Sequence, residues 1–226
     1  MHIVISGASR GIGLALTREY ASAGHRVVAL CRDPSSASAL AGIAAKHGDV
    51  KVLRADVTDA SSIASIRKAL GDAPVDLLLN VAGTIEMEDG PESVDLDRWA
   101  SAFDVMITGP FRTTLALLPN LVAAGGKVVS ISSQMGSSAW TSGGFYSYGA
   151  AKAGLNRAMK SLAVDLRERG VSVIVIHPGH VRTDMGGPNG EISPQESAQG
   201  IKAVIDRAGL DSTGRFFSWN GAEHAW

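Results

Sequence analysis

Tyr148 and Lys152 are the two residues of this sequence whose types and spacing most directly suggest chemistry. They stand four residues apart in Tyr-Gly-Ala-Ala-Lys, so an α-helix places both side chains on one face. A phenol has an ordinary pKa of about 10, and a neighbouring ammonium favours its charged form and lowers that pKa. The pair is therefore predicted to give and accept a proton, although a surface helix can also carry Tyr and Lys at this spacing by accident.

A glycine-rich segment follows the first predicted strand, residues 2–6, and precedes a helical pattern. It reads Ser-Gly-Ala-Ser-Arg-Gly-Ile-Gly, with glycines at positions 7, 11 and 13. Glycines at such a junction let the backbone turn tightly and approach a pyrophosphate at the helix N-terminus, which predicts nucleotide binding. The same letters fit Gly-x-Ser-x-Gly, which would make Ser9 a hydrolase nucleophile. Only six residues precede Gly7, too few for the earlier strand and loop of a hydrolase.

The end of the second predicted strand, residues 26–30, indicates which nucleotide is preferred. The segment Leu30-Cys31-Arg32 lacks the acidic side chain that usually binds the 2′-hydroxyl of NAD(H). Arg32, together with Arg10 of the glycine turn, offers guanidinium groups to a 2′-phosphate. NADP(H) is therefore predicted, with NAD(H) as the alternative. Asp33 would oppose the phosphate if it pointed inward, and the two arginines could instead be solvated surface charges.

Short β-branched runs alternate with longer helical segments along the chain, which is typical of an α/β fold. We expect one domain over residues 1–226, a doubly wound parallel sheet of about seven strands with helices on both faces. The first six predicted strands are residues 2–6, 26–30, 50–55, 75–81, 127–131 and 171–176, and a last strand is expected near Phe216. The Gly- and Pro-rich segment 179–194 is predicted to be a substrate lid loop.

Composition argues against several other classes of protein. The net charge of the 226 residues is -1, so there is no basic field to attract nucleic acid or an anionic membrane. Cys31 is the only cysteine, and the six histidines are scattered, so we expect no disulfide within the chain and no metal site. With no signal peptide or spanning segment recognisable, a cytoplasmic protein is expected.

Six motifs in a fixed order give nearly the whole chain a resemblance to the short-chain dehydrogenase/reductase (SDR) family. Its later half is similar to the C-factor and sniffer-like carbonyl reductases of that family, and a Rossmann-type fold is implied. The motifs are the glycine turn, Asp56-Val57, Asn80-Val81-Ala82-Gly83 with Val where the family has a second Asn, Ile131-Ser132-Ser133, Tyr148 to Lys152, and His177-Pro178-Gly179-His180-Val181-Arg182-Thr183.

The resemblance implies an oxidoreductase that transfers a hydride between NADP(H) and a carbonyl or alcohol substrate. It makes Tyr148 the general acid or base, and Lys152 the residue that holds the nicotinamide ribose and lowers the Tyr148 pKa. Ser133 would donate a hydrogen bond to the carbonyl oxygen, with Ser132 as the second candidate because neighbours alternate along a strand. The implied cofactor-binding residues are Gly7, Ser9, Arg10, Gly11, Ile12, Gly13, Arg32, Asp56, Val57, Asn80, Ala82, Gly83, Tyr148, Lys152, Pro178, Gly179, Val181 and Thr183. A homodimer or homotetramer is also implied, formed through helices that contain residues 108–118 and 155–166.

One position departs from the family pattern. The family usually has an Asn whose main-chain carbonyl holds a water that relays protons to the Lys, and Met106 stands at the matching place. Pro110 has no N–H to donate to the Met106 carbonyl, so a bend at Gly109-Pro110 would leave that carbonyl free to bind water. The rival hypothesis is a damaged relay and slow turnover. It keeps open an alternative function, an NADP(H)-binding sensor or signalling protein with weak or no catalysis.

Overall fold

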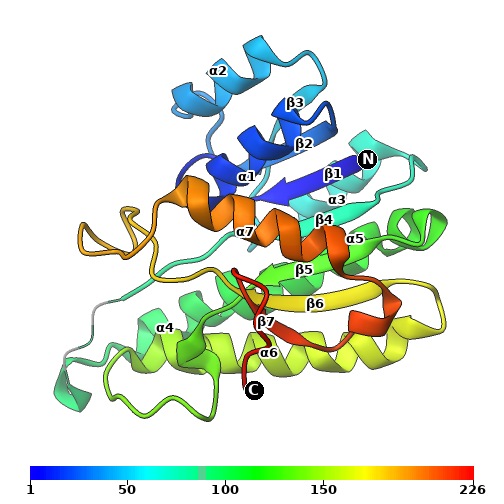
Figure 1. Ribbon diagram of the computed structural model, residues 1–226. Helices are drawn as coiled ribbons and strands as arrows, with labels where there is room; N and C mark the ends of the chain where they lie inside the picture. The colour runs from blue at the N-terminus through cyan, green and yellow to red at the C-terminus, as the bar shows by residue number, and fades with distance from the viewer. Residues whose placement is uncertain (87, 89) are drawn as a thin grey trace.

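The strands of this protein form one parallel sheet, as a computed structural model that describes residues 1–86, 88 and 90–226 shows (Figure 1). Within these residues the sheet has seven strands in the order β3-β2-β1-β4-β5-β6-β7. The strands are β1 (His2–Ser6), β2 (Arg26–Cys31), β3 (Val50–Arg54), β4 (Leu77–Asn80), β5 (Lys127–Ile131), β6 (Ser172–His177) and β7 (Phe216–Ser218). The predicted doubly wound α/β fold is confirmed.

Helices connect the strands and cover the sheet. They are α1 (Gly11–Ser22), α2 (Ser38–Lys46), α3 (Ala60–Leu70), α4 (Leu96–Phe103), α5 (Gly109–Ala124), α6 (Tyr146–Arg167) and α7 (Pro194–Arg207). A π-helical segment, Asp104–Thr108, joins α4 to α5, and short 3-10 helices span Pro91–Ser93, Gln134–Gly136 and Leu210–Ser212. None of the helices in the described residues is long and apolar enough to cross a membrane.

The two faces of the sheet have separate apolar cores, because successive side chains of a strand point to opposite faces. Ile3 and Ile5 of β1 pack with residues of α1, α2 and α7. Val4, between them in sequence, packs with residues of α3, α5 and α6 on the other face. The central strands are therefore buried on both sides, which explains their continuous apolar sequence (Figure 1).

The strand order changes direction at β1, which pairs in parallel with β2 on one side and with β4 on the other. In a doubly wound sheet ligands bind at the carboxyl ends of the strands beside such a switch point. The glycine turn leaves β1 at this edge, and the segments after β4, β5 and β6 leave the sheet at the same edge. This geometry brings together motifs that are more than a hundred residues apart in the chain.

The predicted lid segment 179–194 is ordered at its base. Val181 pairs with Ile192 as an isolated bridge, and the Arg182 amide donates to the Ile192 carbonyl at 2.9 Å. The Arg182 guanidinium also donates to the carbonyls of Gly190 and Glu191. These contacts tie the two ends of the segment together, and the lid role stays a prediction.

Gly13 is required for the close packing of α1 against the glycine turn, and this gives a first testable prediction. A Cβ at Gly13 would overlap the main-chain carbonyl oxygen of Gly7. We expect Gly13→Ala to lower the free energy of unfolding by about 1–3 kcal/mol, measured by urea denaturation. Gly42→Ala is the control, because outside its own helix no atom lies within 4 Å of the position that a methyl group would take, and alanine favours helix α2. Equal stability of the two variants would contradict the packing argument.

Candidate active site

Tyr148 and Lys152 lie in the first two turns of α6, on the face that packs toward the sheet. The Lys152 ammonium is buried and donates a 2.7 Å hydrogen bond to the carbonyl of Ile131, the last residue of β5. It lies 5.6 Å from the centroid of the Tyr148 ring. The structure therefore brings the predicted pair together and ties it to the end of β5.

The pKa values of this pair differ from the sequence expectation. Burial raises the pKa of Tyr148, and a hydrogen bond with Ser133 opposes this rise only in part. No lowering of the Tyr148 pKa by Lys152 accompanies these two effects; the ammonium bonds to the Ile131 carbonyl and lies 5.6 Å from the Tyr148 ring centroid. Burial also lowers the pKa of Lys152 to about 8. Burial thus shifts the pKa of each group toward its uncharged form, and Tyr148 is held in its protonated form.

The two serines at the end of β5 have different partners. The Ser132 hydroxyl donates to the Asn156 side chain at 2.6 Å, and Asn156 in turn donates to the carbonyl of Gly136. Ser132 is therefore occupied in a buried structural link to α6. The Ser133 hydroxyl accepts the Met135 amide at 3.2 Å and hydrogen-bonds with Tyr148. Ser133 is the serine that lies with Tyr148, which favours it over Ser132, and its catalytic role stays a prediction.

The glycine turn forms a concave cradle at the start of α1. Gly7 has φ 68°, and a Cβ there would lie 2.7 Å from the Ala82 amide nitrogen, so the turn packs directly on the end of β4. Helix α1 has no side-chain cap and no acidic residue in its first turn. Its first amides are thus available to an anion, as a pyrophosphate requires. Ser9 and Ile12 belong to the same turn, both partly buried.

Basic residues surround the carboxyl end of β2. The Asp33 carboxylate accepts hydrogen bonds from the amide and hydroxyl of Ser35, which lower its pKa and hold it within its own loop. Arg54, at the end of β3, donates to the Arg32 carbonyl, so a second guanidinium lies at this corner. Arg54 was not predicted from the sequence, although its place near the end of the third predicted strand, residues 50–55, was a usable signal.

Arg10 forms an ion pair with the predicted lid instead of joining Arg32 at the end of β2. Its guanidinium lies 3.4 Å from the Asp184 carboxylate in the predicted lid, and both side chains are exposed. Gly11 packs against Thr183 of the same segment, since a Cβ at Gly11 would lie 3.3 Å from the Thr183 methyl carbon. The glycine turn and the Pro-Gly segment after β6 therefore meet side by side. Gly179, with φ 86°, and the buried Pro178 and Val181 lead the chain to this contact.

The residues after β3 and β4 complete this edge. Hydrogen bonds from Thr58, and to a smaller extent the nearby Arg32 charge, lower the pKa of Asp56. Val57 is buried against Gly109. The Asn80 side chain is buried and donates to Thr114 and Ser130 at 3.4 Å, and its contact with a cofactor stays a prediction.

Gly83 lies where four elements meet. A Cβ at Gly83 would be 3.9 Å from each of three atoms, the Lys152 nitrogen, the Met106 sulfur and the Met185 methyl carbon. These atoms come from α6, the π-helical segment and the predicted lid. The small size of Gly83 therefore leaves room beside the Lys152 ammonium.

Met106 is buried in the π-helical segment and packs in a cluster with Ala102 and Ala151. Tyr148 contacts the same cluster. The hydrogen bonds of a π-helix span one residue more than those of an α-helix, and such segments frequently occur at functional sites. The expected irregularity before Pro110 is thus present, whereas a water relay at the Met106 carbonyl stays a prediction.

Glu88 is a buried acid that was not predicted from the sequence. One carboxylate oxygen accepts the Ser147 amide at 2.9 Å, and the other accepts the Trp99 indole N–H at 3.3 Å. Ser147 lies in the first turn of α6, where a negative charge is favourable. Glu88 therefore fixes the start of the helix beside Tyr148. No spacing in the sequence connects it to α6.

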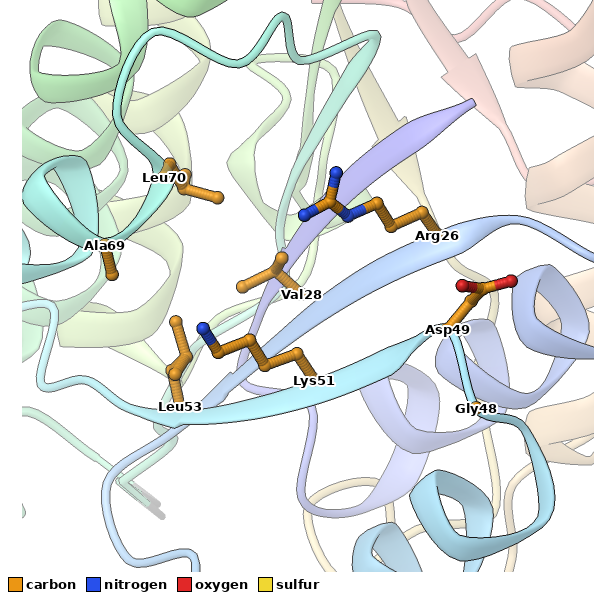
Figure 2. A pocket seen from close by; sticks show the side chains of 8 residues that line it. All are labelled: Arg26, Val28, Gly48, Asp49, Lys51, Leu53, Ala69 and Leu70. Atoms are coloured by element: carbon orange, nitrogen blue, oxygen red, sulfur yellow. The ribbon is translucent and has the colours of Figure 1, made fainter.

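A hollow of about 320 Å³ lies at the other end of the sheet (Figure 2). Arg26, Val28 and Lys51 line it from β2 and β3, and Leu70 closes it from the end of α3. Arg26 begins β2 and Asp49 precedes β3, so the hollow is at the amino ends of these strands. It is separate from the cluster of Ser133, Tyr148 and Lys152.

Comparison with known proteins agrees with this geometry. A family model described as short chain dehydrogenase matches residues 1–192. A relative named C-signal, from Myxococcus xanthus, is 41% identical over 155 residues, which cover 68% of this chain and 93% of the relative.

Two solved structures are similar over the full chain. An NADPH-bound carbonyl reductase from chicken fatty liver matches with a TM-score of 0.92 and 28% identity, covering 100% of this chain and 98% of that one. The carbonyl reductase Sniffer of D. melanogaster matches with a TM-score of 0.93 and 28% identity, covering 100% and 99%. With the family model spanning most of the sequence, the predicted resemblance is confirmed: the chain belongs to the short-chain dehydrogenase family of oxidoreductases.

Proposed function

We propose that this protein is a carbonyl reductase that uses NADP(H) to interconvert an aldehyde or ketone and its alcohol. The observation that carries the proposal is the cluster of Ser133, Tyr148 and Lys152 at the sheet edge occupied by the glycine turn. A hydrogen-bond donor, a protonated phenol and a buried ammonium together suit the protonation of a carbonyl oxygen.

In the direction of reduction, the Ser133 hydroxyl donates to the substrate carbonyl oxygen and orients it. Tyr148 gives its proton to the same oxygen, and its raised pKa keeps that proton in place until negative charge develops there. Lys152 would hold the nicotinamide ribose, and its ammonium, buried 5.6 Å from the Tyr148 ring centroid, would favour the phenolate that forms as the proton leaves. A water on the Met106 carbonyl would then return a proton through Lys152.

The glycine turn and the basic corner after β2 fit a phosphorylated dinucleotide. The amides at the start of α1 would hold the pyrophosphate, and Arg32 would hold the 2′-phosphate, since Asp33 is turned into its own loop. The segment from Pro178 to Thr183 would border the nicotinamide. When bound, the nicotinamide supplies the hydride.

Assembly and an alternative function also belong to the proposal. A homodimer or homotetramer through α5 and α6 is proposed from the family resemblance, and Leu115 and Val164 are exposed apolar residues on these helices. The second candidate function is a cofactor-binding signalling protein with weak catalysis. It is favoured by the similarity to the relative named C-signal and by Met106 in place of the usual Asn.

Tyr148→Phe tests the reductase function directly. We expect the wild type to oxidise NADPH with at least one compound of an aldehyde and ketone panel, followed by absorbance of the reduced nicotinamide. The variant should lose about 10²–10⁴-fold in kcat because it lacks the transferable proton. Its affinity for NADPH, measured by fluorescence titration, should change less than about threefold. NADPH binding by a wild type that reduces no carbonyl would favour the signalling function instead.

Arg32→Ala tests the cofactor preference. Loss of a charged hydrogen bond to the 2′-phosphate should raise the KM for NADPH about 10- to 100-fold and leave the KM for NADH nearly unchanged. Arg26→Ala is the matched control, because Arg26 occupies the opposite end of the same strand and lines the hollow in Figure 2. An equal effect of both substitutions would count against recognition of the phosphate by Arg32.

The pH dependence of the reaction should report Lys152. Its pKa is lowered to about 8, so the charged form is present below pH 8 and is lost as the pH rises through that value. We expect kcat/KM for NADPH, which reports groups of the free enzyme, to fall above about pH 8. Lys152→Arg should be slower at every pH but should lack this alkaline limb, because a guanidinium stays charged. If kcat/KM of the Lys152→Arg variant also falls near pH 8, the titrating group is not Lys152.

A further inference from the structure

The main-chain hydrogen bonds between β5 and β6 end beside Ser133. In the regular ladder Ile131 lies opposite Ile176, and the Ser132 amide donates to the Ile176 carbonyl at 2.8 Å. The next bond of a parallel ladder would run from the Gln134 amide to the carbonyl of Pro178. That carbonyl instead accepts the Ser197 hydroxyl of α7 at 2.7 Å. The Gln134 amide therefore needs an acceptor other than the Pro178 carbonyl.

The His177 side chain supplies the replacement. The Gln134 amide donates to Nδ1 of the imidazole at 3.3 Å, so a side chain of β6 takes the place of the next main-chain acceptor. The two bonds, from the Ser132 and Gln134 amides, fix the chain immediately before and after Ser133. The Ser133 hydroxyl and carbonyl then accept the amides of the following 3-10 turn, from Met135 and Gly136. The hydroxyl direction at Ser133 therefore depends on where the Gln134 peptide is held.

The protonation state of His177 suits this role. Because the Gln134 N–H is the donor, Nδ1 is unprotonated and the ring proton lies on Nε2. Burial, and next the charge of His224, lower the pKa of His177 to about 4, so the acceptor persists at neutral pH. His224 packs against the ring at a centroid distance of 5.7 Å and lies itself 4.7 Å from Phe216. The imidazole is thus held by aromatic contacts while its nitrogen faces the main chain.

We propose that His177 is a positioning residue for Ser133: its imidazole replaces the missing ladder acceptor, holds the Gln134 peptide and so directs the Ser133 hydroxyl toward Tyr148. The inference rests on the proposed carbonyl reductase function. His177 does not act as an acid or base in it, because Nδ1 is used by the Gln134 amide and the ring packs against His224.

Two substitutions separate this role from simple packing. In His177→Asn the side-chain oxygen Oδ1 is bonded to Cγ, as Nδ1 is in histidine. This oxygen can therefore accept the hydrogen bond from the Gln134 amide. His177→Leu has similar bulk and no acceptor. We expect kcat to fall about tenfold or more in the Leu variant and to stay within about threefold of the wild type in the Asn variant. The KM for NADPH should change less than about twofold in both. Equal kcat in the two variants would overturn the proposal.

A double substitution makes the dependence on Ser133 testable. If His177 acts through Ser133, His177→Leu should change kcat less than about twofold when Ser133 is already Ala. A further tenfold loss in the Ser133→Ala background would overturn the proposal. Thermal unfolding of each variant separates loss of fold from loss of turnover.

Hydrogen exchange of the Gln134 amide gives a readout that does not require activity. It should be slow in the wild type and the Asn variant and at least tenfold faster in the Leu variant. Unchanged exchange in the Leu variant would refute the geometric role. Absence of carbonyl reduction by the wild type, with this exchange pattern intact, would refute the proposed function and leave the His177 anchor in place.

Discussion

The buried ammonium of Lys152 is the constraint around which the site is built. A charged group away from water is costly unless hydrogen bonds satisfy it, and here the Ile131 carbonyl accepts at 2.7 Å. This bond ties α6 to the end of β5. The approach is possible because Gly136 has no side chain, since a Cβ there would lie 2.6 Å from the Lys152 carbonyl carbon. The residual cost of burial is visible in the lowered pKa of Lys152.

Other buried polar groups near the site also form hydrogen bonds within the protein. Asn156, one helical turn beyond Lys152, joins Ser132 to Gly136, and Glu88 caps the start of the helix at Ser147. The Asn156 bonds fix α6 relative to the segment after β5, and the Glu88 bond fixes it relative to the segment after β4. Proton transfer requires the reacting groups to be within hydrogen-bond reach, so this rigidity places Tyr148 and Ser133 at a defined separation.

Much of this arrangement could be predicted from the sequence, for physical reasons. Alternating strands and helices predicted the parallel sheet, and the carboxyl ends of parallel strands collect at one edge. The glycine turn was recognisable because only glycine fits the close approach of Gly7 to Ala82. The direction of the Tyr148 pKa shift was wrong, because spacing shows a neighbouring charge but not the burial that outweighs it. Strand alternation likewise separated Ser132 from Ser133 without showing which one lies beside Tyr148 and which one bonds to Asn156.

Other features depend on contacts between distant segments and could not be predicted. Glu88, Arg54 and Asn156 gain their roles only through partners brought near by the fold.

The π-helical segment at Asp104–Thr108 could be predicted in part. Because Pro110 lacks a backbone N–H, the sequence predicted a break in the helical hydrogen bonding near this residue. It did not predict the π-helical turn itself, in which Met106 packs against Ala151 of α6. The acceptor proposed for the proton relay is the main-chain carbonyl of residue 106. The apolar side chain of Met106 can therefore stand in place of the family's usual Asn without removing that acceptor. The unusual residue and a working site are therefore compatible on physical grounds.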